Sequence, residues 1–582
     1  MSKTVSAAPA DQQFARSAYR YFLLWGVLSA LGTTFSTLID AILVGNLVGS
    51  SGLAVTSLAT PVFLTYALLG MTVGVGASVR IGQALGSSDV REANRAFHSL
   101  LLTGLALGAA CLALVLALRG PLLTFLGAEG DLRPLAEQYL TVVFLSAPVF
   151  ILYHILAAAV RTDSDPKLAA ASSAVVIVVN LSLDLVFMQG MGLGIVGASA
   201  SLCIAETLGL LVLLAHFFRR RSLLRLGLKA PRGEDLRKFV ANGFGVGSAY
   251  IFQAVVMFTF NTLLLRSSDG RGVSYVAIFG VIYTASTIPA AVFDGAGNAI
   301  STVVSIFAGE RDSRSILATM RQGQGIVVAA GVLVAAAFAA FARQLVRFFG
   351  IADAADLVTA AQAVRVYALC LVPMGVNVLT TAFWQAIGRA RLAGALSVVR
   401  NFALMLLLGA VLISRMQVLG LSLTYVVTEA LCLLGTVAVY CSRGSQAYVS
   451  RKYSSAGRSY EKVYAISTNS IDEIANDLER ICDEWEIDPR KAFFIHLIIE
   501  ELILNIIKFG LRDTKRARSI AIKLMDNDGE YILRIRDNVH TYNPFDSSGD
   551  DIDNAVINLI TQKTQYCNYQ RKLIFNYLYL IL

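Results

Sequence analysis

Six ionisable side chains lie inside long apolar stretches of this chain, where each needs a functional or structural reason. A charged group in the middle of a bilayer costs about 3 kcal/mol or more, so such residues usually mark an ion or substrate pathway or pair with one another. We therefore treat all six as candidate site residues. They are Asp40, Asp184, Glu206, Asp294, Arg400 and Glu429.

Asn180 and Asp184 are four residues apart in one apolar stretch. This spacing places both side chains on the same face of a helix. An amide oxygen and a carboxylate oxygen are suitable ligands for a small hard cation. Alternatively, a carboxylate in a dry cavity can load and release a proton. The spacing is compatible with either Na⁺ or H⁺.

Structural roles are the alternatives for two of these acids. Asp40 follows Thr33 and Thr37 on the same stretch and could serve only as a hydrogen-bond partner for one of those hydroxyls. Asp294 is followed by Gly295, Gly297 and Asn298, a pattern that is also expected at a broken helix.

The composition indicates a membrane protein. The 582 residues are 56% hydrophobic and 15% charged, and the mean hydropathy is +0.63, which is too apolar for a soluble chain. The formal net charge of +9 fits membrane orientation better than nucleic-acid binding. The cysteines are scattered and suggest neither a disulfide framework nor a zinc site. We expect the first apolar run to be a retained span, not a signal peptide.

Twelve stretches are long enough to cross a hydrocarbon core of about 30 Å as helices. We predict an all-α polytopic bundle with spans near 21–45, 54–82, 96–118, 138–160, 168–188, 192–217, 238–264, 273–303, 320–342, 362–386, 392–413 and 417–440. Lys and Arg are concentrated in alternate loops, beginning with the segment before the first span. This distribution places both termini in the cytoplasm of a multi-pass protein of the cell membrane, and we expect a bacterial source.

An internal repeat accompanies this pattern. A shift of 223 residues superposes Gly86 to Asp89 on Gly309 to Asp312, and Glu206 on Glu429. Two six-span halves of this kind are parallel repeats related by an axis normal to the membrane, and a substrate path is expected between them. Glu206 and Glu429 could then be matching hydrogen-bond staples, one in each half.

The domain prediction has four parts. They are an N-lobe at 1–220, a C-lobe at 221–441, a linker at 442–459 and a small cytoplasmic α+β domain at 460–582. In the last part we expect helices near 470–486, 489–509 and 552–563, and strands near 518–525, 530–536 and 572–581.

Several motifs of the membrane part resemble the multidrug and toxic compound extrusion (MATE) family. They are Leu38–Gly45 with Gly52-Leu53-Ala54, Thr60-Pro61, Gly74-Val75-Gly76, Gly82–Gly86, Asn180–Asp184 and Gly194–Ser199. The resemblance covers roughly residues 15–440 and is stronger in the first half.

This resemblance implies an antiporter that exports drugs or other organic cations by alternating access, driven by inward Na⁺ or H⁺ flux. The cation site of the family's N-lobe maps onto Asp40, Asn180 and Asp184, which would hold Na⁺ if sodium is the coupling ion. A further hydroxyl would be supplied near Ser201 or Leu202. No cofactor is implied for transport, and the bilayer and a small cationic substrate are the expected partners.

Three residues of the tail, Glu501, Asn505 and Lys508, share one helical face. Together with Leu533–Asn538, they resemble the Bergerat-type ATPase fold of anti-sigma factor serine kinases and histidine kinases. The resemblance implies Glu501 as a base, Asn505 as a Mg²⁺ ligand, Lys508 on phosphate and Asp537 on adenine. It also implies an anti-sigma-antagonist-like protein partner.

The tail departs from that pattern in two places. Val539 stands where a glycine is expected, and Ser547–Asp551 provides one glycine and two acids where phosphates should bind. A degenerate interaction module is therefore the alternative to an ATP-dependent enzyme.

Two other functions compete with export. One is a membrane-tethered signalling regulator that uses the bundle as a sensor. The other is a flippase for lipid-linked substrates, although such a cavity would need several basic residues and Arg400 is alone.

Overall fold

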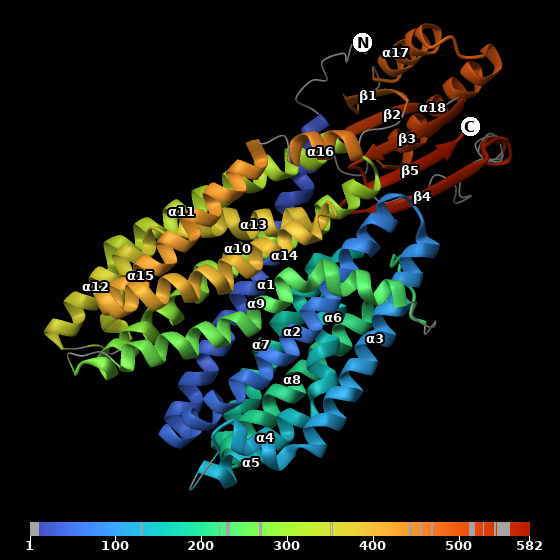
Figure 1. The fold of residues 1–582 in the computed structure, drawn as a ribbon. Helices are drawn as coiled ribbons and strands as arrows, with labels where there is room; N and C mark the ends of the chain where they lie inside the picture. Colours follow the sequence, from blue (N-terminus) through green and yellow to red (C-terminus); the bar gives the residue numbers. More distant parts are fainter. Residues whose placement is uncertain are drawn as a thin grey trace.

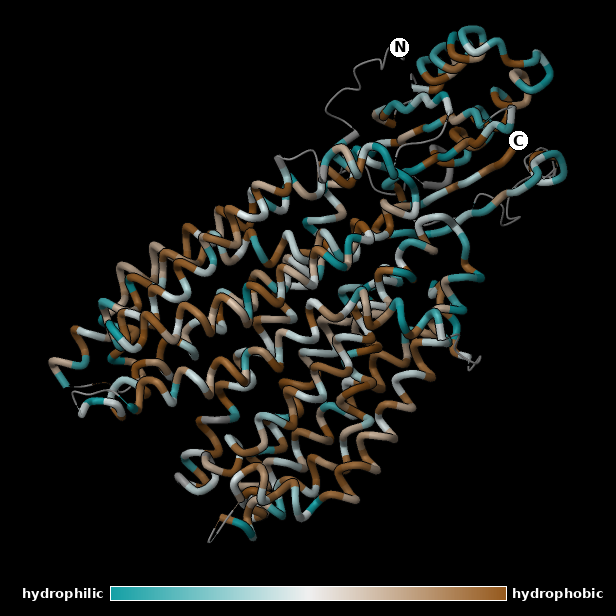
Figure 2. The backbone as a smooth tube through the Cα atoms, viewed as in Figure 1, coloured by the Kyte–Doolittle hydropathy of each residue, from teal (hydrophilic) through white to brown (hydrophobic). Residues whose placement is uncertain are grey.

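A helical bundle with a small sheet domain at one end makes up the computed structural model (Figure 1). The structure describes residues 11–128, 130, 132–219, 221–227, 233–266, 270–349, 351, 353–441, 445–453, 457–466, 470–510, 518–527, 529–540, 543 and 559–582. Apolar residues dominate the bundle, whereas polar residues are more frequent on the outer side of the sheet domain (Figure 2).

The first lobe contains the helices before residue 220, and we call it the N-lobe. They are α1 (Asp11–Leu47), α2 (Ser50–Gly86), α3 (Val90–Ala117), α4 (Arg119–Phe125), α5 (Leu132–Leu145), α6 (Ala147–Thr162), α7 (Pro166–Asp184), the π-helix η1 (Leu185–Gly190) and α8 (Gly194–His216).

The C-lobe follows with an equivalent set. Its helices are α9 (Gly233–Leu265), α10 (Gly272–Gly309), α11 (Ser313–Phe348), α12 (Ala354–Ala368), α13 (Leu371–Ala386), α14 (Ala390–Val398), the π-helix η2 (Val399–Ala403) and α15 (Leu404–Cys441).

The number of spans depends on how the bent helices are counted. Among the described residues, nine helices are long and apolar enough to cross a membrane, or eleven if each of two bent pairs is one span. One of the nine, Ala390–Tyr440, has 51 residues and would be about 75 Å long if straight. It reverses at Gln417 (φ 47°), where a Cβ on Gly420 would lie 2.0 Å from the Leu412 carbonyl oxygen. Counting its two arms separately gives twelve spans.

The two lobes repeat the same irregularities at the offset found in the sequence. The pair α5–α6 bends by 47° and the pair α12–α13 by 44°. Ser88 and Arg311, which are 223 positions apart, are both left-handed, with φ of 63° and 54°. The next residues, Asp89 and Asp312, each cap the following helix by accepting a backbone N–H bond. A duplicated bundle explains this coincidence.

The sheet domain has five antiparallel strands in the order β1-β2-β3-β5-β4. They are β1 (Arg458–Ala465), β2 (Ser519–Asn527), β3 (Glu530–Asp537), β4 (Tyr566–Lys572) and β5 (Phe575–Ile581), with helices α17 (Ser470–Glu484) and α18 (Pro489–Gly510). β1 and β4 were not predicted. The strand expected at 572–581 is observed as β5, which follows β4 after a tight turn at Leu573 (φ 57°). Much of β4 is polar, which explains why it was overlooked.

The linker expected at 442–459 and the helix expected at 552–563 differ in part from the structure. The segment expected to be a linker, 442–459, contains helix α16 (Ser445–Lys452) and the start of β1. Of the helix expected at 552–563, residues 559–563 are helical and the earlier residues lie outside the described part of the chain.

Both faces of the sheet are covered. Ile522, Ile535 and Leu578 are neighbours in register and pack with the apolar side of α17 and α18. The opposite face presents Arg536 and Tyr577, paired in register, to the end of the bundle. In Figure 1 the sheet accordingly lies between its own helices and the transmembrane helices.

Candidate functional site

The N-lobe brings together the three residues that were predicted to bind a cation. Asn180 donates from Nδ2 to Asp184 Oδ2 at 3.1 Å. The Asp40 carboxyl on α1 lies within hydrogen-bonding reach of both side chains. Asp184 is fully buried and Asn180 nearly so. Two acids and an amide from α1 and α7 therefore form one compact polar cluster.

A serine hydroxyl completes this cluster. Ser201 of α8 donates to Asp184 Oδ1, which selects it over Leu202 as the hydroxyl expected from this helix. Tyr139 of α5 is also buried nearby and interacts electrostatically with both acids. Sequence analysis did not predict Tyr139, because a tyrosine in an apolar span carries no distinguishing pattern.

The chemistry of the cluster favours a bound cation or proton. Two carboxylates in contact repel each other unless positive charge lies between them. In addition, Asn180 Oδ1 is buried and has no hydrogen-bond partner among the described residues. An unpartnered buried acceptor is costly, and a cation bound beside the two acids would satisfy it.

The structural alternative for Asp40 is not observed. Thr37 donates its hydroxyl to the Thr33 carbonyl oxygen, and Thr33 donates to the Ala30 carbonyl oxygen. Both hydroxyls are therefore engaged by the backbone of their own helix.

A π-helical segment follows Asp184 directly, and a second one contains Arg400. Such segments widen a helix locally and often occur at functional sites. Each lobe thus has a local irregularity at its buried ionisable group, which periodicity alone did not predict.

The buried ionisable cluster of the C-lobe is an ion pair. Arg400 Nε lies 2.8 Å and 2.9 Å from the two carboxylate oxygens of Glu429. Asn377 donates to the same carboxylate at 2.8 Å. Arg400 is thus neutralised inside its own lobe and does not make a basic cavity.

Glu206 does not mirror this arrangement. Its Oε2 is buried without a hydrogen-bond partner among the described residues, whereas Glu429 is fully engaged. Among the described residues, Glu429 links helices of its lobe and Glu206 has no such bond, so the interpretation of the two acids as matching staples is wrong.

Asp294 is an exposed residue in the middle of α10, where it interacts electrostatically with Arg400 and with Tyr250 of α9. Helix α10 is continuous through this position, so the alternative of a broken helix at Asp294 is wrong. Asp294 belongs to the other lobe from Asp40, and the residue after it, Gly295, packs against Gly26 and Val27 of α1.

The lobes touch closely at the end nearest the sheet domain. A Cβ on Gly86 would lie 2.0 Å from the Ile306 carbonyl oxygen, and one on Gly309 would lie 2.0 Å from the Gln83 carbonyl oxygen. Gln83 also donates to the Ala386 carbonyl oxygen at 3.0 Å. At the opposite end α4 and α5 lie apart from α12 (Figure 1). The bundle is thus closed toward the sheet domain and diverges away from it.

The sheet domain bonds to both lobes at this closed end. Lys572 donates to the Gly86 carbonyl oxygen at 3.1 Å and to Ser88 Oγ at 2.8 Å in the N-lobe. Arg536 and Tyr577 donate to Glu310 Oε2 of the C-lobe at 2.8 Å and 3.0 Å. These three side chains belong to one sheet, so the sheet bridges the lobes.

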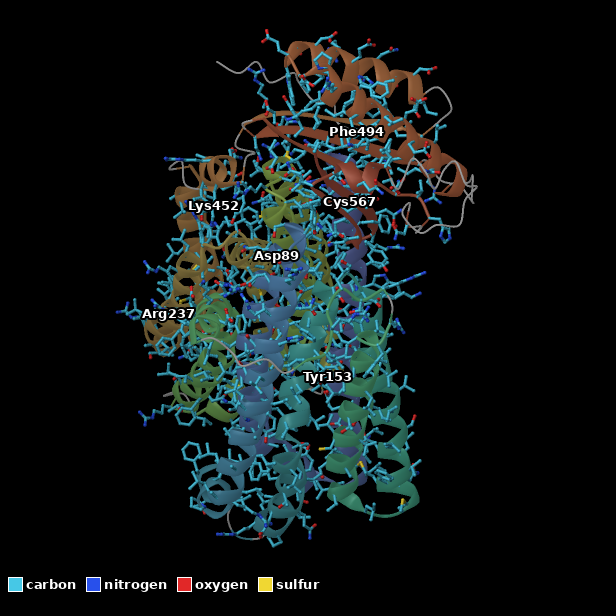
Figure 3. All side chains as sticks on the ribbon, turned by 90° about the vertical axis from the view of Figure 1, so that its right-hand side faces the viewer. Asp89, Tyr153, Arg237, Lys452, Phe494 and Cys567 are labelled. Atoms are coloured by element: carbon cyan, nitrogen blue, oxygen red, sulfur yellow. The ribbon has the colours of Figure 1, made fainter. Side chains whose placement is uncertain are left out.

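A second view shows the same arrangement. In Figure 3, Asp89 lies in the end of the bundle that faces the sheet domain, while Phe494 and Cys567 lie within the sheet domain itself. Asp89 directly follows Ser88, the N-lobe contact of Lys572.

The tail residues predicted to bind nucleotide are only partly brought together. Asn505 donates to Glu501 Oε1 at 3.0 Å, while the side chain of Lys508 lies outside the described residues. Asp537, at the end of β3, accepts from Asn576 at 2.8 Å and from the Val539 N–H at 3.0 Å. Its carboxylate therefore already has partners. The segment Ser547–Asp551 also lies outside the described residues.

A two-lobed polytopic bundle with buried ionisable clusters in each lobe defines an integral membrane transporter. The MatE family model matches residues 27–186 and 247–412, which is more than half of the chain. The chain therefore belongs to the MATE family of multidrug efflux transporters, whose members are transporters and not enzymes.

Curated relatives agree with this assignment. The chain is 22% identical to the multidrug export protein MepA of Staphylococcus aureus (strain NCTC 8325 / PS 47) over 424 residues, which is 72% of this chain and 92% of that protein. It is also 22% identical to MepA of Staphylococcus saprophyticus over 428 residues, 73% of this chain and 93% of that protein.

Solved structures show the same fold. An outward-facing multidrug resistance MATE transporter of the MOP superfamily superposes with a TM-score of 0.70 and 20% identity, covering 77% of this chain and 100% of that one. A MOP superfamily transporter from Pyrococcus furiosus gives a TM-score of 0.69 and 21% identity, covering 77% and 99%. The family model ends at residue 412, before the sheet domain.

Proposed function

We propose that this protein exports small organic cations in exchange for inward Na⁺ or H⁺, by alternating access of its two lobes. The observation that carries the proposal is the contact between Asp40 and Asp184 beside the unpartnered oxygen of Asn180. Cation binding would relieve the repulsion between these acids, and release of the cation would restore the repulsion. That difference in free energy can be coupled to movement of the lobes.

The multidrug assignment of the MepA relatives supports drugs or other organic cations as the substrate class. The exposed Asp294 provides a negative charge between helices that could attract such a substrate, whereas Arg400 is held by Glu429. This arrangement is less suited to the anionic head group of a lipid-linked substrate.

Transport in proteoliposomes tests this proposal. With an imposed Na⁺ or H⁺ gradient, the wild-type protein should drive efflux of a cationic dye, and the gradient that works identifies the coupling ion. The double variant Asp40→Asn/Asp184→Asn should lose at least about 90% of gradient-driven efflux, in line with a site worth several kcal/mol. Glu137→Gln, which removes an exposed acid paired with Arg119, is the matched control. Wild-type rates in the double variant would disprove the proposed site.

We also propose that the sheet domain regulates transport by holding the lobes together at its end of the bundle. An inward-facing state requires these ends to separate, but Lys572 and Arg536 bond to different lobes from one sheet. Undocking of the sheet domain would therefore be needed before the transporter can open toward it.

A signalling role for the tail has less support. One face of the sheet is buried on the bundle and the other is covered by α17 and α18, and Asp537 is already hydrogen-bonded to Asn576. ATP or Mg²⁺ binding by Glu501, Asn505 and Asp537 stays a proposal, and nucleotide titration of the full chain would test it.

A further inference from the structure

A cavity of about 530 Å³ lies where the sheet domain meets the start of α1 and the segment after α8. Helix α1 contributes Ser17 and Tyr21, the segment after α8 contributes Arg221, and the sheet domain contributes Arg518 and Arg571. Three parts of the chain that are distant in sequence therefore form its wall.

The lining of this cavity is strongly basic. The described residues that line it include three arginines and His540, and they include no acid. Neither Arg221 nor Arg571 forms an ion pair with any described residue. Arg221 and Arg571 are exposed and Arg518 is half-buried. Like charges that line one cavity without a counter-charge repel one another and attract an anion.

Two details show that the basic groups are not satisfied by the protein. Arg518 uses one nitrogen to donate to the Asn538 carbonyl oxygen, but its Nε is buried without a partner. Burial lowers the pKa of the Arg571 guanidinium, and the nearby positive charge of Arg221 lowers it further. The arginines thus face one another with little compensation.

An acid close to two of these arginines is engaged elsewhere. Asp537 interacts electrostatically with Arg518 and Arg571, but its carboxylate accepts from Asn576 and from the Val539 N–H. Asp537 alternates with Arg536 along β3 and so lies on the helix-covered face of the sheet, outside the cavity lining.

We propose that this cavity binds a phosphate-bearing anion through Arg221, Arg518 and Arg571. Guanidinium groups bind phosphate oxygens in pairs of parallel hydrogen bonds, which makes arginine the preferred residue for such a ligand. Ser17 and Tyr21 would add hydroxyl donors from α1. The ligand is either a soluble phosphate compound or the head group of an anionic lipid.

Binding would connect the sheet domain to the N-lobe. Because the cavity exists only while the domain is docked, an anion that occupies it stabilises the docked form by mass action. This inference rests on the proposed regulation by docking and adds a ligand that would control it. Anion binding can nevertheless be measured without any transport assay. Failure of one proposal is thus distinguishable from failure of the other.

The test uses the full chain in lipid nanodiscs. In discs of phosphatidylcholine alone, the protein is titrated with inorganic phosphate and with ATP. The shift in its thermal unfolding temperature measures the binding of soluble anions. In discs of equal parts phosphatidylcholine and phosphatidylglycerol, native mass spectrometry of the retained lipid measures whether the anionic lipid binds. A response only to soluble anions identifies a soluble ligand, and a response only to phosphatidylglycerol identifies a lipid.

Variants of the lining arginines test whether the anion binds in this cavity. Arg518→Gln/Arg571→Gln should weaken binding in the responding arm at least tenfold, whereas Arg20→Gln, an exposed arginine of α1 outside the lining, should leave it within twofold. If the Gln pair does not fold, Arg518→Lys/Arg571→Lys should fold and bind several-fold more weakly. No response in any arm, or wild-type affinity in the folded double variant, would overturn the proposal.

Discussion

At the scale of single residues, the two lobes use buried charge in different ways. In the N-lobe, Asp40 and Asp184 are close together and neither has a basic partner among the residues that the structure describes. In the C-lobe, Glu429 accepts from Arg400 and Asn377. The first arrangement needs an external cation or proton, and the second is internally neutral. This contrast makes the N-lobe cluster the better candidate for ion coupling.

The ion pair of the C-lobe should be important for stability. Glu429→Gln removes the hydrogen-bonded counter-charge of the buried Arg400 guanidinium, which should reduce the free energy of unfolding by about 3–5 kcal/mol. Thermal unfolding of the purified protein in detergent measures the loss. Glu206→Gln is the repeat-related control and should have a much smaller effect, because Glu206 Oε2 has no partner to lose. Equal losses for the two variants would contradict this assignment.

At the scale of elements, close helix contacts hold one end of the bundle shut. Gly86 of α2 and Gly309 of α10 allow the backbones of the two lobes to touch, as small residues commonly do between membrane helices. In addition, Arg80 of α2 pairs with Asp235 of α9. The closed end is therefore stabilised by packing and by charge.

A single methyl group at this contact should change the conformational equilibrium. In Gly309→Ala the new Cβ would lie 2.0 Å from the Gln83 carbonyl oxygen, so the lobes must separate. We expect spin labels at Ser87→Cys and Arg311→Cys to report a longer distance in this variant than in the parent. Gly280→Ala on the same helix, where nothing lies within 4 Å, should leave the distance unchanged. An unchanged distance in Gly309→Ala would show that this contact does not hold the end shut.

At the scale of the whole molecule, the sheet domain is a third body that bonds to both lobes. The double variant Arg536→Gln/Lys572→Gln removes the side chains that bond to the two lobes. It should release the sheet domain and increase the fraction of molecules whose lobe ends are separated. The same pair of spin labels and the rate of dye efflux measure this release. Lys462→Gln, which removes a lysine paired only with acids of α17, is the control. A double variant that matches the parent in both measurements would argue against regulation by docking.

Docking should also depend on pH through Lys572. Burial lowers the pKa of this amine to about 7, with further lowering by Arg534 and Arg536 and opposition from Glu310. Between about pH 7 and its ordinary pKa near 10.4, the docked form therefore binds fewer protons than the undocked form.

The direction of the effect follows from this difference in bound protons. Docking should strengthen as pH rises from about 7, by at most about tenfold per pH unit, and should not change below pH 7. Hydrogen exchange of residues 566–581 measures docking across this range. Lys572→Met removes the titrating group and should make that docking independent of pH, whereas a wild-type pH profile in Lys572→Met would assign the effect to another group.

The sequence by itself determined that the chain is a polytopic membrane protein built from a repeat, because apolar length and a constant offset are local properties of the chain. It also indicated Asp40 and Asp184, since ionisable groups in apolar helices are conspicuous, and Asn180 by its four-residue spacing from Asp184. The hydroxyl near Ser201 was implied only by the resemblance to the MATE family. It did not reveal β1 and the polar strand β4, whose pairing partners are distant in the sequence.

Only the tertiary structure decided which buried charges have partners. Glu206 and Glu429 are equivalent by offset, yet only Glu429 meets an arginine, because pairing depends on helices brought together by packing. The same holds for the bridge from Lys572 and Arg536 to the two lobes and for the arginine-lined cavity. These features join residues hundreds of positions apart, and no periodicity or spacing in the chain records contacts of that kind.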